Sequence, residues 1–371
     1  MTGANVVGAS PSSFDHHDLR RRVARRLMRL VFGRHQQPDG KPLPAHGVYR
    51  ILVCRISHSL GNTLLLTPLL AELGRLYPEA EIDILTRSPV ADDVFGHFFQ
   101  VNRIFRLPAH GVGHPLQYLG PLRRMRRIQY DLAIDADPLS QTGRLLTLLS
   151  NATWTLGFSS PKKHGRITHA VPLPPHLRHK GQLPVYLLRH AMARDTAEAS
   201  PPPDLCITPD ERRHGREALL RSLAAYGIDS PGQGIIGVFA NATGDKLIGQ
   251  DWWERFLHVL ETRYPQHRIV EIVPAFGRSM LGSRHPAYFS SDLRKLASVL
   301  AGLDAYISAD CGIMHLACTA RVPTFGIFTV TDPAEWGPYG AGNHVIPAQG
   351  REPEAVAQTI ADLLQPTTPA H

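Results

Sequence analysis

The residues best suited to chemistry lie where an apolar run, residues 304–309, meets the polar turn Asp310-Cys311-Gly312. The apolar run predicts a buried parallel strand, and the apolar residues that follow at helical spacing predict a helix from Gly312 onward. The first backbone amides of a helix lack intrahelical acceptors, and the helix dipole places partial positive charge beside them. Because a glycine there leaves those amides accessible, we expect this turn to bind the diphosphate of a nucleotide sugar.

Two further side chains suit the same ligand. Lys246 follows another predicted strand, in a loop containing Gly244, where a point cation could hold phosphate charge; the alternative is an ordinary surface lysine. His315 lies in the helix that begins at Gly312 and could contact the donor sugar or balance phosphate charge, although an isolated helical histidine is more often structural. On the residues alone, an ordinary surface lysine is the favoured alternative for Lys246.

The segment around this turn resembles the signature of glycosyltransferase family 9, the bacterial ADP-heptose:lipopolysaccharide heptosyltransferases. That signature is Asn-Asp-Thr-Gly-Pro-Met-His-Leu-Ala, followed by Pro-Thr-Asp-Pro-x-x-Trp-x-Pro. The residues that match it are Asp310, Gly312, Met314, His315, Leu316, Ala317, Thr331, Asp332, Pro333, Trp336 and Pro338. Cys311 stands where the family has threonine, and Ile313 where it has proline.

A second match lies near the front of the chain, where residues 55–62 and Thr67-Pro68 resemble the family's Arg-x-Ser-x-x-Gly-Asp and x-Thr-Pro. This loop is one residue longer before Gly61, and it ends in Asn62 rather than aspartate. A weaker third match covers residues 237–253, with Lys246 and a tryptophan in the family's places. The segments follow the family order from about residue 49 to about residue 345.

The resemblance implies an inverting glycosyltransferase of GT-B fold that moves heptose from ADP-heptose to the lipopolysaccharide inner core. It requires no cofactor and no metal. The donor-binding residues that it implies are Lys246, Asp310, Cys311, Gly312, His315, Thr331 and Trp336. The acceptor-loop residues are Ser57, Ser59 and Gly61. Asp310 could instead cap the helix that follows it, as aspartate often does.

The catalytic base is the main departure from the family. The aspartate that ends the family's Ser-x-x-Gly-Asp acts as the base, whereas the amide of Asn62 cannot accept a proton at neutral pH. His58 lies in the same loop, and imidazole is a common general base in proteins, so His58 is the first candidate for a substitute. Asp137, in the Asp135-x-Asp137 segment after another predicted strand, is the second. The third possibility is that no base remains.

The residues expected to bind the donor nucleotide also differ from the family. The family has a glutamate in a glycine-rich loop that holds the ribose, and residues 274–278 of this chain offer none. Glu271 lies within the preceding predicted strand, so we do not expect it to substitute. The alternatives are therefore a related transferase with another nucleotide sugar and a non-catalytic relative that binds such a sugar.

The elements that position these residues alternate between strand and helix. A βα series from Tyr49 and a second one from Ile235 predict two doubly wound, Rossmann-like α/β domains facing a central crevice. We assign residues 1–47 to an N-terminal extension and linker, 48–205 to an acceptor domain and 206–371 to a nucleotide-sugar domain. In this prediction Leu60–Leu76 form one helix, each domain has its own core, and the closing helix Pro353–Leu364 packs back across the domains.

Composition narrows the remaining possibilities. The chain has 371 residues, of which 43% are apolar and 19% charged, as expected of a globular protein. Four scattered cysteines argue against a disulfide framework or a zinc site, and Cys311 and Cys318 are expected in the core. No apolar run is long enough to span a membrane, and no signal peptide is evident, so we expect a cytoplasmic protein.

The net charge of +8 indicates an anionic partner. Residues 19–34 predict a basic amphipathic helix that either binds anionic lipid at the cytoplasmic membrane face or docks on the protein itself. The expected partners are a nucleotide-sugar donor and an anionic, lipid-linked oligosaccharide acceptor. No nucleic-acid-binding motif accompanies the arginines, so we do not expect a nucleic-acid partner.

Overall fold

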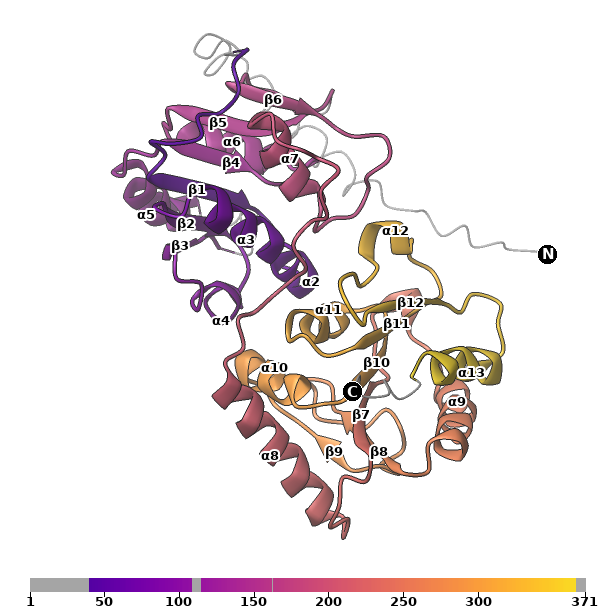
Figure 1. The fold of residues 1–371 in the computed structure, drawn as a ribbon. Coiled ribbons are helices and arrows are strands. Elements are labelled where there is room, and N and C mark those ends of the chain that lie inside the picture. Colours follow the sequence, from indigo (N-terminus) through magenta and orange to yellow (C-terminus); the bar gives the residue numbers. More distant parts are fainter. Residues whose placement is uncertain (1–39, 109–114, 162, 365–371) are drawn as a thin grey trace, which may run out of the picture.

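The computed structural model describes residues 40–108, 115–161 and 163–364. Within these residues the chain forms two parallel sheets, each of six strands, with helices packed against them (Figure 1). The strand orders are β3-β2-β1-β4-β5-β6 and β12-β11-β10-β7-β8-β9. In each sheet the order in which strands are added reverses beside the strand that comes first in the chain. This is the doubly wound topology, which places ligands at the carboxyl ends of the strands.

The strands of the first sheet are β1 (Arg50–Arg55), β2 (Glu81–Thr86), β3 (Val101–Arg106), β4 (Leu132–Asp135), β5 (Trp154–Ser159) and β6 (His169–Pro172). The strands of the second sheet are β7 (Gly234–Phe239), β8 (His267–Ile272), β9 (Ala287–Tyr288), β10 (Ala305–Ala309), β11 (Thr324–Phe328) and β12 (His344–Pro347). The central strands are buried along nearly their whole length because helices cover both faces of each sheet.

The helices that accompany the first sheet are α2 (Leu60–Leu64), α3 (Thr67–Leu76), α4 (Ala91–Phe95), α5 (Pro115–Arg126), α6 (Gln141–Leu149) and α7 (Leu183–Ala191). Those of the second are α8 (Pro209–Ala225), α9 (Gln250–Arg263), α10 (Leu293–Ala301), α11 (Gly312–Thr319), α12 (Pro333–Trp336) and α13 (Pro353–Leu363), with a 3₁₀ turn at Gly244–Lys246. The assigned boundary between residues 205 and 206 falls in the extended segment between α7 and α8.

The prediction of a single helix over residues 60–76 is wrong. The chain forms α2 and then α3, with the break at Leu65-Leu66. Pro68 has no backbone N–H to continue the helical hydrogen bonds of α2. The Thr67 hydroxyl instead donates to the Leu64 carbonyl at 2.8 Å, so α3 starts in a new direction and α2 is left as a short helix at the domain boundary.

The prediction of separate cores is also wrong. One apolar cluster runs from the first sheet through α3 and α7 to α8, α10 and α11 of the other half, and it includes Leu69, Leu188, Leu219, Leu300 and Leu316. The outer faces of the two sheets have clusters of their own. Burial of this shared apolar surface holds the two halves together.

The described part of the predicted N-terminal linker is docked on the first half. Leu43 is buried, and its amide donates to the Ala191 carbonyl at 2.7 Å. The Tyr77 hydroxyl donates to the Pro44 carbonyl at 2.9 Å. Residues 40–45 are therefore part of the domain rather than a free linker. The predicted basic helix over residues 19–34 lies outside the described residues.

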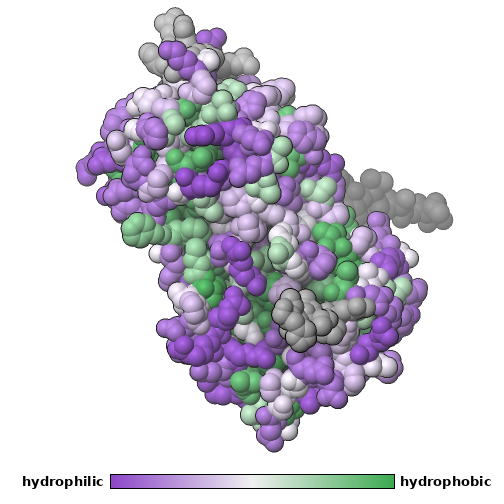
Figure 2. All heavy atoms as spheres, in the orientation of Figure 1, coloured by the Kyte–Doolittle hydropathy of each residue, from purple (hydrophilic) through white to green (hydrophobic). Residues whose placement is uncertain are grey.

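Helix α13 does not cross to the other half, contrary to the prediction. It packs on α9, where the Tyr264 hydroxyl donates to the Ala361 carbonyl and Arg255 pairs with Glu352 and Glu354. The face drawn in Figure 2 is mainly hydrophilic, with hydrophobic residues in several small patches, some of them where the two halves meet. None of the helices in the described residues has the length and apolar character needed to span a bilayer.

A buried ion pair connects α3 to α7. The Arg189 guanidinium donates to both carboxylate oxygens of Glu72, at 2.8 and 3.1 Å, and Arg75 donates to the same carboxylate from a half-exposed position. Burial by itself raises the pKa of the Glu72 carboxyl, but the hydrogen bonds from Arg189 and Arg75 outweigh it, so that pKa lies below its usual value. Glu72 is therefore a buried carboxylate that depends on its partners.

Replacing Arg189 by methionine should lower the free energy of unfolding by about 3–5 kcal/mol, because the variant leaves the buried Glu72 charge without its main partner. The matched change Arg75→Met removes a half-exposed partner and should cost about 1 kcal/mol or less. Urea unfolding of both variants measures the difference. Equal losses would contradict the assignment of Arg189 as the principal partner.

Candidate functional site

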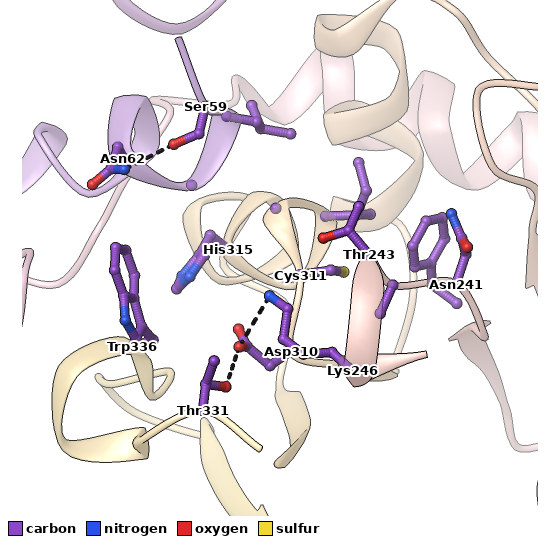
Figure 3. Close-up of a pocket in the computed structure, with 16 residues that line it drawn as sticks. Ser59, Asn62, Asn241, Thr243, Lys246, Asp310, Cys311, His315, Thr331 and Trp336 are labelled. Carbon is purple, nitrogen blue, oxygen red and sulfur yellow. Dashed lines mark hydrogen bonds and ion pairs between the residues drawn. The ribbon is translucent and has the colours of Figure 1, made fainter. Parts of the chain in front are cut away.

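A cavity of about 510 Å³ opens between the two halves, where the predicted motifs come together. It lies beside the carboxyl ends of the central strands and is drawn in Figure 3. Its lining residues are Ser59, Leu60, Gly61, Asn62, Phe239, Asn241, Ala242, Thr243, Lys246, Asp310, Cys311, Gly312, Ile313, His315, Thr331 and Trp336. The predicted donor-binding residues all line it, as do Ser59, Gly61 and Asn62 of the front motif.

Asp310 is the centre of a polar group on the second half of the cavity wall. The Lys246 ammonium lies 3.3 Å from its carboxylate, and the Thr331 hydroxyl donates to the same oxygen (Figure 3). Asp310 does not cap α11, since the residue at the N-cap is Cys311 and no side chain caps that helix. The alternative of a merely capping aspartate is therefore wrong, and Asp310 instead positions a cation that faces the cavity.

The start of α11 is closed on one side by the other half of the molecule. A Cβ at Gly312 would lie 3.2 Å from Cβ of Leu60, so the glycine permits α2 to approach α11 closely. Without a capping side chain, the first amides of α11 remain available to an anion in the cavity. Cys311 lines the cavity and also packs, partly buried, against the shared apolar cluster, while Cys318 is buried as expected.

His315 lies between the two halves and is almost fully buried. A Cβ at Gly61 would lie 2.9 Å from its Cδ2 and 3.5 Å from its Nε2, so this edge of the ring faces α2. The Trp336 ring lies on another side, with 6.5 Å between ring centroids. Burial lowers the pKa of His315 to about 4. The imidazole is therefore neutral near pH 7 in the free protein and cannot balance phosphate charge there.

Asn62 is held by hydrogen bonds at both ends of its amide. The Arg55 guanidinium donates to its Oδ1 at 2.6 Å, and its Nδ2 donates to the Ser59 hydroxyl at 2.8 Å. Arg55 is buried, and burial lowers its pKa, an effect that the carboxylates of Asp137 and Asp135 oppose. The Asn62 amide thus occupies the position beside a buried cation where a carboxylate would be expected.

His58 and Asp137 do not line the cavity. His58 is exposed, and Ser57 also lies outside the lining, although its hydroxyl is 3.3 Å from that of Ser59. Asp137 accepts hydrogen bonds from the backbone amides of Leu139 and Ser140, and its other oxygen lies 3.5 Å from Arg55. The structure therefore does not bring either candidate base together with the donor-binding residues.

A buried charge cluster lies behind Asp137. Asp135 is fully buried and pairs with Arg144 at 3.0 Å and with Lys163 at 2.6 Å. Burial raises the pKa of Asp135, and the two cations oppose that effect. Asp135 is thus fixed within the first domain and is not presented to the cavity. Within the described residues, no group of three or more His, Cys, Asp and Glu is placed to hold a metal ion.

Glu271 holds the loop that follows β8. Its carboxylate accepts from the Ser279 hydroxyl at 2.5 Å and from the Met280 amide at 2.6 Å, and it is fully buried. The expectation that it does not replace the family's ribose-binding glutamate agrees with this arrangement, because its oxygens are used within its own domain.

A second contact between the halves, which no sequence motif predicted, is formed by residues 178–180 and 332–339. We term it the interdomain contact. Arg178 pairs with Asp332, and the Lys180 ammonium lies 2.9 Å from Glu335. His179 Nε2 donates to the Gly337 carbonyl at 2.9 Å. Lys180 also lies 5.8 Å from the centre of the Trp336 ring, so this contact supports a wall of the cavity.

Part of the second half of the chain matches a known family. Residues 290–364 match glycosyltransferase family 9 (heptosyltransferase), a stretch that begins just before α10 and ends with α13. The resemblance to this family is thereby confirmed. The match also confirms the prediction of a glycosyltransferase. The front motif around Asn62 and the segment around Lys246 lie outside the matched residues, and no curated protein matches the chain significantly.

Solved structures of the same fold extend the comparison to most of the chain. A family 9 glycosyltransferase from Veillonella parvula DSM 2008 is 18% identical, with a TM-score of 0.71, covering 87% of this chain and 99% of that one. The E. coli heptosyltransferase WaaC with ADP is 18% identical, with a TM-score of 0.64, covering 85% and 99%. E. coli ADP-heptose lps heptosyltransferase II is 17% identical, with a TM-score of 0.62, covering 85% and 98%. The predicted GT-B fold is confirmed.

A double-mutant cycle of Lys180→Met and Glu335→Gln should yield a coupling energy of about 0.5–1 kcal/mol, because the two side chains form an ion pair across the domain boundary. Urea unfolding of the wild type, both single variants and the double variant provides the four free energies. As a control, Arg278→Met combined with Glu335→Gln should be additive. A Lys180–Glu335 coupling near zero would contradict the contact.

The interdomain contact should weaken at acid pH because of His179. Its Nε2 donates to Gly337 and its Nδ1 accepts from the Gly181 amide, and burial lowers its pKa. Below pH 6.5, the ordinary value, the unfolded chain binds this proton before the folded protein does. The free energy of unfolding should therefore fall as the pH falls from about 6.5 through the folded pKa.

The variant His179→Gln lacks this proton-binding group, so its free energy of unfolding should decline less between pH 7.5 and pH 5 than that of the wild type. Urea unfolding at a series of pH values measures both curves. Parallel curves would show that His179 does not contribute.

Proposed function

We propose that this chain is an inverting glycosyltransferase that moves heptose from ADP-heptose to the lipopolysaccharide inner core. The observation that carries the proposal is the cavity itself, which combines the front-motif residues Gly61 and Asn62 with Lys246, Asp310 and His315. E. coli heptosyltransferase WaaC shares the fold, and its structures are reported with ADP and with ADP-2-deoxy-2-fluoro heptose. These two ligands support a nucleoside diphosphate sugar as the ligand of this cavity.

Transfer of a sugar from a diphosphate requires stabilisation of the departing charge. In our proposal the Lys246 ammonium and the uncapped first amides of α11 hold the diphosphate, since both face the cavity and together supply a full and a partial positive charge. Asp310 positions Lys246 through their ion pair. No metal and no further cofactor enters the proposed reaction.

The sugar would lie between the two halves, where the acceptor must meet it. Asp310 and His315 are proposed to orient the sugar, while Thr331 and Trp336 shape the pocket beside it. The acceptor hydroxyl would enter from the side of Ser59, Gly61 and Asn62, which belong to the first domain. Attack from that side, opposite the diphosphate, inverts the configuration at the anomeric carbon in a single displacement.

The proposed acceptor is anionic and lipid-linked, and the proposed location is the cytoplasmic face of the membrane. A net charge of +8 is compatible with an anionic, lipid-linked acceptor and with work at the cytoplasmic membrane face. The predicted lipid-binding segment, residues 19–34, lies outside the described residues. A nucleic-acid partner is not proposed.

Two rival functions rest on specific observations. The loop after β8 has no glutamate for the ribose, and Glu271 is occupied by Ser279 and Met280, which favours a transferase that uses another nucleotide sugar. The amide of Asn62 beside Arg55 is what a non-catalytic relative would show after loss of its base. Both rivals retain the cavity and its diphosphate-binding groups.

Thermal unfolding with ADP, GDP and UDP tests the proposal. A nucleotide that binds only the folded state at 100 times its Kd adds about 2.7 kcal/mol to the free energy of unfolding. We expect ADP to stabilise the protein selectively. A preference for GDP or UDP would favour another donor, and no response to any of them would contradict a nucleotide-sugar site.

The variant Lys246→Met should lose most of this stabilisation, because it removes the only lysine that lines the cavity within the described residues. The matched control is Lys295→Met, which changes an exposed lysine on α10 and should respond to ADP as the wild type does.

A further inference from the structure

We infer that His315 is the general base of the proposed transfer, taking the place of the aspartate that Asn62 replaces. This inference rests on the proposed function and names the residue that performs its proton transfer. It follows from the position of the imidazole between the two halves and from the engagement of the other candidate groups elsewhere.

The position of the ring is the first argument. His315 is attached to α11, on the half that carries Lys246 and Asp310, yet the Cδ2–Nε2 edge of its ring faces Gly61 of the other half. A Cβ at Gly61 would lie 2.9 Å from Cδ2 of this ring, which is too close for a side chain, so the glycine lets the loop and the ring approach this closely. The ring therefore lies where a hydroxyl from the first domain and a sugar from the second must meet.

The availability of the ring nitrogens is the second argument. Within the described residues, neither nitrogen of His315 takes part in a hydrogen bond, although the side chain is almost fully buried and lines the cavity. A molecule bound in the cavity can therefore supply the hydrogen-bond partner of a ring nitrogen. In the neutral imidazole one nitrogen has a lone pair that can accept a proton from such a partner.

The other groups of the cavity are excluded one by one. Asn62 cannot accept a proton, and its amide oxygen already accepts from Arg55. One carboxylate oxygen of Asp310 accepts from both Lys246 and Thr331. Burial raises the pKa of the Cys311 thiol, which keeps it protonated. Lys246 and Asp310 are paired with each other and Cys311 contacts Ser308, so in the part of the chain that the structure describes His315 is the titratable side chain of the lining that forms neither an ion pair nor a hydrogen bond.

The strength of this base suits the task. Burial lowers the pKa of His315 to about 4, close to the value of about 3.9 for an ordinary aspartate. The free imidazole is therefore unprotonated across the neutral range, as the replaced carboxylate would be. Binding of a diphosphate adds negative charge nearby, which raises that pKa and makes the ring a better acceptor when the donor is present.

The proposed transfer is a single displacement at the anomeric carbon. The acceptor oxygen forms a bond to the anomeric carbon while the bond from that carbon to the diphosphate oxygen breaks, and the electron pair of that bond leaves with the diphosphate. The hydroxyl proton passes to a ring nitrogen of His315, giving an imidazolium that later releases the proton to water. Lys246 and the amides of α11 stabilise the departing diphosphate.

The test compares His315→Gln with the wild type, using ADP-heptose and lipopolysaccharide inner core that lacks heptose. Glutamine keeps polar contacts but cannot accept a proton, so kcat should fall about 10²–10⁴-fold. The ADP concentration that gives half of the maximal thermal stabilisation, measured on the same preparations, should change by less than threefold. The control His258→Gln, an exposed histidine on α9, should leave kcat unchanged.

A second variant guards against a merely structural effect. His315→Ala should regain turnover when imidazole is added, with an acid limb in the pH profile that follows the pKa of the added base. If His315→Gln keeps kcat within threefold, or loses ADP stabilisation together with kcat, the inference is overturned while the proposed function stands. If the wild type transfers no heptose and is not stabilised by ADP, both the inference and the proposed function are contradicted.

Discussion

The close approach of α2 to α11 is the contact on which the arrangement of the site depends. Two glycines make it possible, because a side chain at Gly61 would meet His315 and one at Gly312 would meet Leu60. These helices belong to different halves of the molecule, so their contact brings the front motif and the second motif to one cavity (Figures 1 and 3). Without it, each motif would face its own half of an open crevice.

The rest of the interface supports this contact from both sides. The shared apolar cluster joins α3 and α7 to α10 and α11, and the interdomain contact of residues 178–180 reaches Trp336 on the opposite wall. The apolar part is non-directional, whereas the ion pairs and the His179 hydrogen bond fix the orientation. An interface with both kinds of contact restricts how far the halves can turn without disturbing the cavity.

Electrostatics differ sharply across the cavity. The first domain presents an amide, Asn62, held by the buried Arg55, while the second presents the Asp310–Lys246 pair and a neutral imidazole. The neutral amide of Asn62 adds no negative charge beside Arg55, whose nearby carboxylate is that of Asp137 at 3.5 Å. The GT-B fold is thus present although the side chain beside Arg55 is an amide, because a fold does not by itself fix the chemistry of a site.

The sequence by itself determined the alternation of strands and helices, since buried parallel strands are continuous apolar runs and their helices have apolar faces at a regular spacing. It also placed Lys246, Asp310 and His315 after strand ends, where a doubly wound sheet gathers its ligand-binding groups. Only the tertiary structure decided that His58 faces solvent and that Asn62 is tied to Arg55. It also decided that residues 178–180 meet 332–339. A local sequence pattern indicates which residues are buried and where turns occur. The contacts decided by the tertiary structure either join segments that are distant in the chain or depend on the direction of a side chain within a loop.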